Sequence, residues 1–174
     1  MVTPEEREWM WETYAPQPRM RLNLGIRRRL APLMDNDQRK ILLMHSLLLT
    51  MGGSPFLYYG DEIGMGDNIW LEDRNGLRTP MQWDASLNAG FSSASPEKLY
   101  APVISDDIYG YAQVNVAAQR ANPNSLLNCV RHMLTIRKQH PAFGWGTFDW
   151  EDTGNNAIAA YRRKTEEEAL LIFN

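Results

Sequence analysis

The sequence predicts an α/β fold in which helices alternate with buried parallel strands. A helix opened by residues 35–37 carries leucine and isoleucine around most of its circumference, which is typical of a deeply buried helix. Gly52-Gly53 ends this helix, and residues 55–60 (PFLYYG) follow as a short apolar run that favours a fully buried strand. A buried helix, a tight turn and a buried strand form the repeating unit of a parallel sheet.

The chain opens with a predicted helix. Thr3 is a capping residue, a proline occupies the first turn, and Glu6 completes a capping box. This helix should run to about Tyr14 and stop at the following prolines, Pro16 and Pro18.

The periodicity vanishes from Gly64 to about Asn124. Irregular segments longer than about 12–15 residues are uncommon unless they are functional or disordered. Spaced aromatic residues argue against disorder, because they offer apolar area for packing. These residues are Trp70, Trp83, Phe91, Tyr100, Tyr109 and Tyr111. We therefore expect a folded excursion over a binding face.

A second amphipathic pattern follows this excursion. Ser125 is expected to cap a helix that Pro141 terminates, with apolar residues at helical spacing and basic residues near its carboxyl end. Beyond it, residues 147–150, 157–163 and 169–173 resemble short strands separated by turn residues. They predict the start of an antiparallel β unit.

Composition excludes several classes of partner and site. The formal charge is −3, with 18 Lys and Arg against 21 Asp and Glu, which argues against a nucleic-acid partner. The basic run Arg27-Arg28-Arg29 is expected to be a solvated or ion-paired loop. The longest apolar stretch, 41–51, is interrupted and falls short of the about 20 residues that span a bilayer. We expect no membrane partner.

The single cysteine, Cys129, excludes an internal disulfide and a cysteine-based metal cluster. It is expected to be a buried, inert thiol, which fits a reducing cytoplasm. No basic and apolar leader pattern opens the chain. The histidines at 45, 132 and 140 fall in or beside apolar helices, so structural roles are expected for them.

Two features carry the predicted chemistry. Asp61 and Glu62 follow the predicted strand at its carboxyl end, where ligands sit in parallel α/β folds. They are the best candidate pair for acid–base work, although neighbouring strand residues point to opposite faces and are not expected to serve one bond together. The alternative is that one or both accept hydrogen bonds from neighbouring loops. Arg78 lies inside an aromatic-rich loop, where its planar fork could grip a carboxylate or adjacent hydroxyls. Its alternative role is a buried structural ion pair.

The motifs "GGSPFLYYGDEIGMGD" (52–67) and "RTPMQWD" (78–84) resemble those of the α-amylase family of retaining glycoside hydrolases and transglycosidases. Within that family, "NIWLEDRNGL", "GIRRRLAPLMDND" and the segment 118–148 look most like the trehalose synthases, which interconvert maltose and trehalose. The resemblance covers essentially the whole chain.

The resemblance implies that residues 1–141 form the C-terminal part of a (β/α)₈ TIM barrel, with 64–124 as a long active-site loop. It implies that residues 142–174 are the first strands of an antiparallel β-sandwich. The family's mechanism uses an aspartate nucleophile, a glutamate acid/base and a bracing aspartate, through a covalent glucosyl-enzyme intermediate. The substrate would be a disaccharide, maltose or trehalose.

The resemblance assigns substrate binding to Arg78, by its place in the second motif, and less directly to Asp61, Glu62, Trp70 and Asp73. The motifs that hold the three carboxylates do not occur in this sequence, so we expect no catalytic residue in the chain. We expect it to be a fragment that is inactive alone. No cofactor or metal is expected, and any calcium site would lie outside this segment.

Two alternatives stay open at this point. One is an oligo-1,6-glucosidase-like α-glucosidase, and the other is a non-catalytic carbohydrate-binding module. A partial barrel should also be poorly soluble or prone to associate. The sequence leaves open whether the full-length enzyme is a homo-oligomer.

Overall fold

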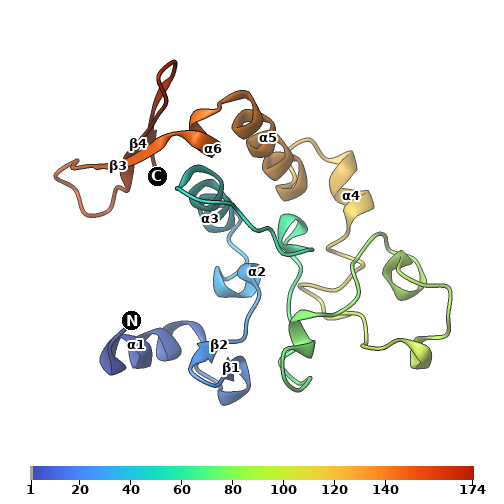
Figure 1. The fold of residues 1–174 in the computed structure, drawn as a ribbon. Coiled ribbons are helices and arrows are strands. Elements are labelled where there is room, and N and C mark those ends of the chain that lie inside the picture. The colour runs from blue at the N-terminus through green and yellow to red at the C-terminus, as the bar shows by residue number, and fades with distance from the viewer. Residues whose placement is uncertain (1) are drawn as a thin grey trace.

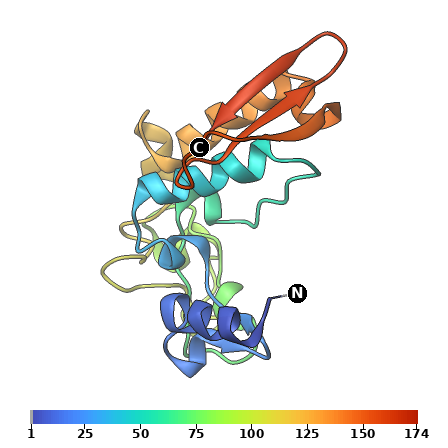
Figure 2. The same cartoon turned by 90° about the vertical axis from the view of Figure 1, so that its left-hand side faces the viewer.

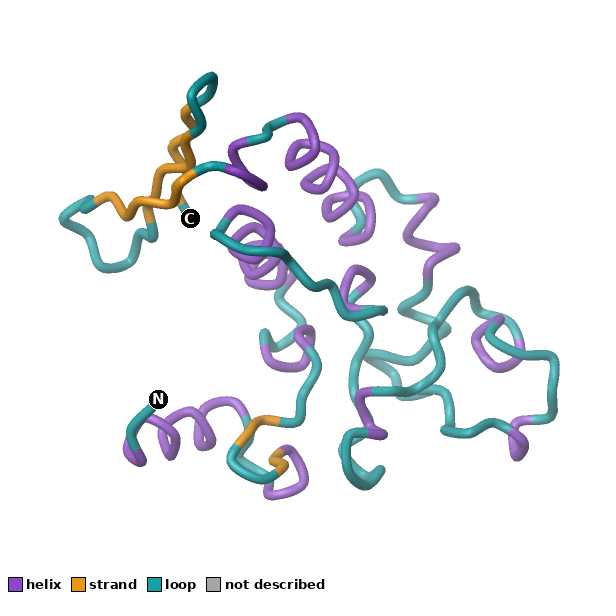
Figure 3. Tube along the Cα trace, viewed as in Figure 1, coloured by secondary structure: helices purple, strands orange, loops and turns teal. Residues whose placement is uncertain are grey.

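The computed structural model of the chain describes residues 2–174 and shows helices and irregular segments followed by a small sheet (Figures 1 and 3). The helices are α1 (Pro4–Tyr14), α2 (Leu30–Leu33), α3 (Gln38–Thr50), α4 (Val116–Ala121), α5 (Leu126–Gln139) and α6 (Ala142–Trp145). The strands are β1 (Arg21–Leu22), β2 (Gly25–Ile26), β3 (Thr147–Glu151), β4 (Ala160–Lys164) and β5 (Ala169–Phe173). The short 3-10 turns are η1 (Pro18–Met20), η2 (Asp61–Ile63), η3 (Asn75–Leu77), η4 (Leu87–Gly90) and η5 (Pro96–Lys98).

The predicted capping box begins α1. The Thr3 hydroxyl accepts from the Glu6 amide at 3.2 Å, and the Glu6 carboxylate accepts from the Thr3 amide at 2.7 Å. The helix ends at Tyr14, as predicted. It lies with the β1–β2 hairpin at one end of the molecule, away from the C-terminal sheet (Figure 2).

The core of the chain lies where α3 packs against α5. Its buried side chains are Ala31, Ile41, Leu126 and Val130. The N-caps follow the predictions, because the Asp37 side chain accepts from the Arg39 amide and that of Ser125 accepts from the Asn128 amide.

The prediction that α3 is deeply buried around its circumference is wrong. Only Ile41, His45 and Leu49, spaced four residues apart, are buried, whereas Leu43 and Leu48 are 40% and 39% exposed. One stripe of the helix faces α5 and the turn at Asp61, and the C-terminal residues contact the helix at Ser46 and Thr50, which leaves Leu43 and Leu48 partly exposed.

The predicted buried strand at 55–60 is also wrong for this structure. The segment runs to a turn, in which the Asp61 amide donates to the Tyr58 carbonyl at 3.1 Å, and Phe56 is 88% exposed. Among residues 2–174 all strand pairs are antiparallel, so the predicted parallel sheet is not formed. A strand needs a partner for its backbone groups, and no other strand of these residues pairs with this segment.

Residues 64–124 form a folded excursion, as predicted. Met65, Met81 and Val116 of this segment pack with Ile63, just before it, in a small buried cluster. Short 3-10 turns interrupt the loop, and Figure 3 shows most of it as connecting segments. Helix α4 was not predicted, although Asn115 caps it in the usual way by accepting from the Ala118 amide at 2.8 Å.

The predicted C-terminal strands are confirmed as an antiparallel sheet of order β3-β4-β5. Tyr161 and Arg163 on β4 are 0% and 1% exposed. The ring of Tyr161 stacks on that of Phe148, with 5.1 Å between the ring centroids. Arg163 joins the sheet to α3, because its guanidinium donates to the Thr50 carbonyl at 2.9 Å. The predicted domain boundary and β-sandwich stay predictions. No helix within residues 2–174 has the length and apolar character needed to cross a membrane.

Candidate functional site

A pocket of about 370 Å³ lies between the turn at 59–62 and the irregular loop that contains Arg78. Its lining combines several aromatic and apolar side chains with one carboxylate and one guanidinium. The lining residues are Tyr59, Glu62, Arg78, Thr79, Pro80, Met81, Trp83, Phe91, Leu99, Tyr100 and Ala101. Such a concave, mostly apolar site with few polar groups is typical of small-molecule binding.

The irregular segment 78–84 is held by hydrogen bonds that a periodic element would not provide. Thr79 and Gln82 are 0% exposed. The Gln82 side-chain amide donates to the Tyr109 carbonyl at 3.0 Å and to the Val114 carbonyl. The Tyr59 hydroxyl donates to the Thr79 carbonyl at 2.9 Å. These bonds fix the loop as one wall of the pocket.

Arg78 lies at the edge of this pocket with an exposed side chain. Its guanidinium makes no ion pair or hydrogen bond with residues 2–174. The alternative of a buried structural ion pair is therefore wrong. The planar donor fork is available to a ligand that presents a carboxylate or adjacent hydroxyls.

Glu62 and Asp61 point to different surroundings. Glu62 lines the pocket, and its Oε2 accepts from the Gly60 amide at 2.7 Å. The Asp61 Oδ1 pairs instead with Nη1 of Arg29 at 3.0 Å. Burial raises the pKa of Asp61, and the Arg29 charge opposes that rise. The pair thus diverges as predicted, although it does so on the 3-10 turn η2 and not at a strand end.

Trp70 and Asp73 do not line the pocket of Arg78. Trp70 is 69% exposed, with the Arg19 guanidinium 5.1 Å from its ring, and it lines a separate cavity of about 360 Å³. Asp73 is exposed, has a positive φ of 49°, and lies 3.5 Å from the Arg74 guanidinium. Their role in substrate binding stays a prediction, and the structure does not bring them to Arg78.

The run Arg27-Arg28-Arg29 does not line the pocket, but Arg29 donates to residues beside it, a contact that sequence reasoning missed. Arg27 and Arg29 are 7% and 3% exposed, so the prediction of a solvated loop is wrong for them. The ion-paired alternative is confirmed for Arg28, which lies 3.0 Å from Asp67, and for Arg29. The only sequence signal for these buried ion pairs was the run of three consecutive arginines without a wider basic face.

The histidines and the cysteine take no part in this pocket. His45 is 1% exposed, with Nε2 3.4 Å from the Asp61 carbonyl, and burial lowers its pKa. His140 pairs with Glu168, whereas His132 is exposed. Cys129 is half-buried and not fully buried as predicted. Within residues 2–174 there is no group of three or more His, Cys, Asp or Glu side chains arranged to hold a metal ion.

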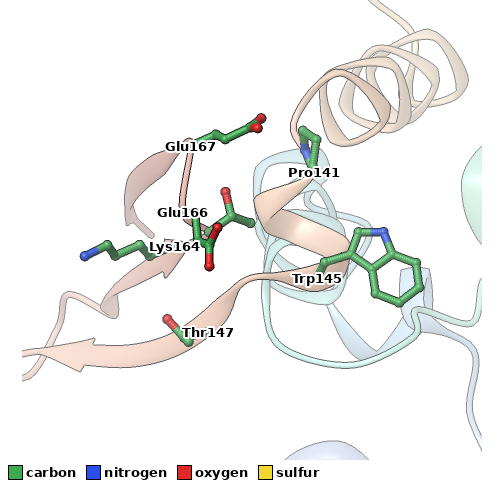
Figure 4. A pocket seen from close by; sticks show the side chains of 7 residues that line it. Pro141, Trp145, Thr147, Lys164, Glu166 and Glu167 are labelled. Carbon is green, nitrogen blue, oxygen red and sulfur yellow. The ribbon is translucent and has the colours of Figure 1, made fainter.

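A wider cavity of about 990 Å³ lies at the junction of α6 with the C-terminal sheet (Figure 4). Its lining residues are Pro141, Trp145, Thr147, Lys164, Thr165, Glu166 and Glu167. Trp145 is 90% exposed, and Lys164 points away from it (Figure 4). None of the predicted site residues lies here, and the side chains do not converge on a common point.

The chain is similar to known proteins over most of its length. The family described as "Alpha amylase, catalytic domain" matches residues 25–146. A trehalose synthase of Pimelobacter sp. is 58% identical over 164 residues, covering 94% of this chain and 29% of that protein. A trehalose synthase/amylase of Mycobacterium tuberculosis is 57% identical, and the match covers 94% of this chain and 27% of that protein. A trehalose synthase of Thermus thermophilus is 51% identical over 172 residues, covering 98% and 18%. The chain thus spans less than a third of each of these relatives.

Solved structures show a similar arrangement of the backbone. An isomaltulose synthase mutant from Erwinia rhapontici, in complex with D-glucose, superposes with a TM-score of 0.66 at 28% identity. It covers 84% of this chain, which matches 32% of that one. An inactive double mutant of MutB in complex with isomaltulose gives a TM-score of 0.67 at 26% identity. The match covers 86% of this chain and 33% of that one.

Proposed function

The chain belongs to the α-amylase family, and on this premise we propose that it forms part of an α-glucosyl isomerase that interconverts maltose and trehalose. In this proposal the pocket beside Arg78 holds the glucosyl unit that is transferred. The whole protein's activity is inferred from relatives named trehalose synthase, which are 51% to 58% identical to the chain.

The observation that carries this proposal is the Arg78 guanidinium at an aromatic pocket, where it has no partner among residues 2–174. A pyranose ring presents apolar C–H faces and rims of adjacent hydroxyls. Aromatic side chains such as Tyr59 and Trp83 can pack against the C–H faces. The donor fork of Arg78 can bind the adjacent hydroxyls. The cavity volume of about 370 Å³ falls within the range of small-ligand sites.

We propose that this chain alone is inactive. Retaining glycosidases use two carboxyl groups about 5–5.5 Å apart, one as nucleophile and one as acid/base. Among residues 2–174 the pocket is lined by a single carboxylate, that of Glu62. The catalytic carboxylates would all come from other parts of a longer protein, since the chain matches only 29% of the Pimelobacter relative.

The same idea explains the exposed segment at 55–60. In the proposed (β/α)₈ TIM barrel this segment would pair with neighbouring strands and cover Phe56, which is 88% exposed here. We propose that residues 1–141 are the C-terminal part of that barrel, and that residues 142–174 begin a β-sandwich. We also propose that the enzyme is cytoplasmic and binds no cofactor through this segment.

The test is to incubate two polypeptides with maltose and to measure trehalose and glucose over time. One is the full-length protein that contains this chain, and the other is residues 1–174 alone. We expect trehalose from the first and none from the second. Robust trehalose formation by the chain alone would overturn the proposed inactivity.

Arg78→Gln in the full-length protein tests the pocket. A hydrogen bond to a charged group contributes about 1.5–3 kcal/mol to binding. Losing those of Arg78 should therefore lower kcat/KM about 10- to 100-fold. Arg74→Gln is the matched control, because Arg74 is exposed on the same loop and pairs only with Asp73 among residues 2–174. Equal losses in both variants would contradict the role of Arg78.

A second candidate is an α-glucosidase. An oligo-1,6-glucosidase of Parageobacillus thermoglucosidasius is 28% identical over 164 residues, covering 75% of this chain and 28% of that protein. Free glucose as the main product from maltose would favour this alternative. A non-catalytic carbohydrate-binding module requires the chain to fold alone. A sharp, cooperative thermal transition of a monomer that binds maltose without converting it would favour that function.

A further inference from the structure

A buried arginine, Arg29, lies behind the pocket that Arg78 lines. Its side chain is 1% exposed, and it occupies the position directly before α2. It does not line the pocket itself. A buried guanidinium is costly unless its N–H groups find acceptors, so the acceptors of Arg29 indicate what it holds in place.

The Arg29 guanidinium joins two segments that are distant in sequence. Nη1 donates to the Tyr59 carbonyl at 2.7 Å and to the Asp61 carboxylate at 3.0 Å. Nη2 donates to the Leu77 carbonyl at 2.8 Å. The Nε–H is buried without an acceptor among residues 2–174, so Nη1 and Nη2 make all of these bonds.

The two tyrosine rings add a second kind of contact. The guanidinium carbon lies 5.0 Å from the ring centroid of Tyr58 and 5.0 Å from that of Tyr59. Cation–π contacts of this length stabilise an arginine more when they are removed from water. The two ring centroids are themselves 4.8 Å apart, so both rings contact the guanidinium from the same side.

Each joined segment carries one wall of the pocket. Tyr59 and Glu62 belong to the first wall, whereas Leu77 directly precedes Arg78 on the second. The Tyr59 hydroxyl also donates to the Thr79 carbonyl, which adds a direct bond between the walls. The guanidinium thus lies where the spacing of the two walls is set.

We infer that Arg29 is a positioning residue that fixes the distance between the wall carrying Tyr59 and Glu62 and the wall carrying Arg78. This inference rests on the function proposed above. Lysine at this position keeps a positive charge near Asp61. A single ammonium group lacks the planar fork that reaches both backbone carbonyls, and it stacks less well on the rings. The walls should then separate and hold the sugar less tightly.

Arg163 offers a matched control at the other end of the molecule. It is 1% exposed, and its guanidinium also donates to backbone carbonyls. The acceptors are Thr50 at 2.9 Å, Thr147 at 3.0 Å and Gly146 at 3.1 Å. None of these residues lines the pocket of Arg78. Arg29→Lys and Arg163→Lys should therefore both lower the melting temperature, but only the first should change the pocket.

The experiment compares both variants with the wild type in the full-length protein, with maltose as substrate. KM is independent of the fraction of folded enzyme, so a merely structural loss does not change it. We expect Arg29→Lys to raise KM about tenfold or more, because small misplacements of binding groups have large effects, and Arg163→Lys to leave it unchanged. An unchanged KM in Arg29→Lys, or an equal rise in both variants, would overturn the inference.

Amide hydrogen exchange provides a readout that needs no turnover. Exchange at residues 59–64 and 76–81 should accelerate in Arg29→Lys and stay at the wild-type rate in Arg163→Lys. If the wild type makes no trehalose, the proposed function fails while this measurement still decides the role of Arg29. Unchanged exchange in Arg29→Lys would refute that role. If this variant does not fold, Tyr58→Leu, which removes one stacked ring, should raise exchange and KM in the same direction but less, and no change in either would refute the role.

Discussion

Gln82 is the buried polar residue whose replacement tests the pocket wall most directly. It is 0% exposed, and its side-chain amide donates to the Tyr109 and Val114 carbonyls. No backbone amide of residues 2–174 donates to either carbonyl. Gln82→Leu keeps a similar volume and removes both donors. The carbonyls of Tyr109 and Val114, two half-buried residues, then lose this donor.

The magnitude follows from the groups left unpaired. A fully buried carbonyl that loses its donor costs about 1–3 kcal/mol, so these two half-buried groups together cost at most about 2–6 kcal/mol. The Gln82 Oε1 atom is itself buried without a partner among residues 2–174, and removing it returns about 1 kcal/mol. We expect a net loss of about 3 kcal/mol in the local free energy of opening, which corresponds to about 100-fold faster exchange.

Amide hydrogen exchange of the full-length protein measures this loss locally. The probes are the Val116 amide, which donates to the Gln82 carbonyl at 3.0 Å, and the Trp83 amide, which donates to the Ala89 carbonyl at 2.8 Å. Gln113→Leu is the control, because Gln113 is exposed on the same loop. If Gln82→Leu accelerates exchange of these amides by less than about threefold, the wall does not depend on these bonds, and the reasoning is refuted.

Two further predictions concern a glycine and an ion pair. Gly76→Ala would place a Cβ 2.1 Å from the Asn68 carbonyl oxygen, so we expect a shifted η3 turn and a melting temperature lowered by several degrees. Gly144→Ala, where a Cβ meets nothing within 4 Å, should be near neutral, and equal losses in both would contradict the clash. The hydrogen bond with His140 lowers the pKa of Glu168 below its ordinary 4.5. A lowered folded-state pKa adds stability above pH 4.5 that is lost as the pH falls below it, so Glu168→Gln should flatten the acid limb of a melting-temperature profile. An unchanged limb would show that the pair adds nothing.

Some predictions from sequence concerned features encoded by a few neighbouring residues, and these were accurate. The caps at Thr3, Asp37 and Ser125 are present, because a capping side chain bonds to an amide two or three residues away. The C-terminal strands are confirmed for a related reason, since each strand pairs with its neighbour in sequence. The resemblance to trehalose synthases and to the α-amylase family is confirmed by the relatives and the family match.

The candidate site was only partly predictable. Arg78 and Glu62 meet in one pocket, as their place in two motifs indicated, whereas Trp70 and Asp73 lie outside it. The strand prediction at 55–60 depended on the length, the aromatic content and the bounding turn residues of a short apolar run. Whether such a segment forms a strand depends on a partner that its own residues do not specify.

Local residue patterns were enough to specify the helix starts, the C-terminal antiparallel strands, the family and the motif that contains Arg78. The burial of Arg29, its pairing with Asp61 and the position of Glu62 at the pocket depend on the folded chain. The physical reason is the distance along the chain. Arg29 binds carbonyls 30 and 48 residues away, and no local pattern reveals which distant backbone groups will satisfy a buried charge.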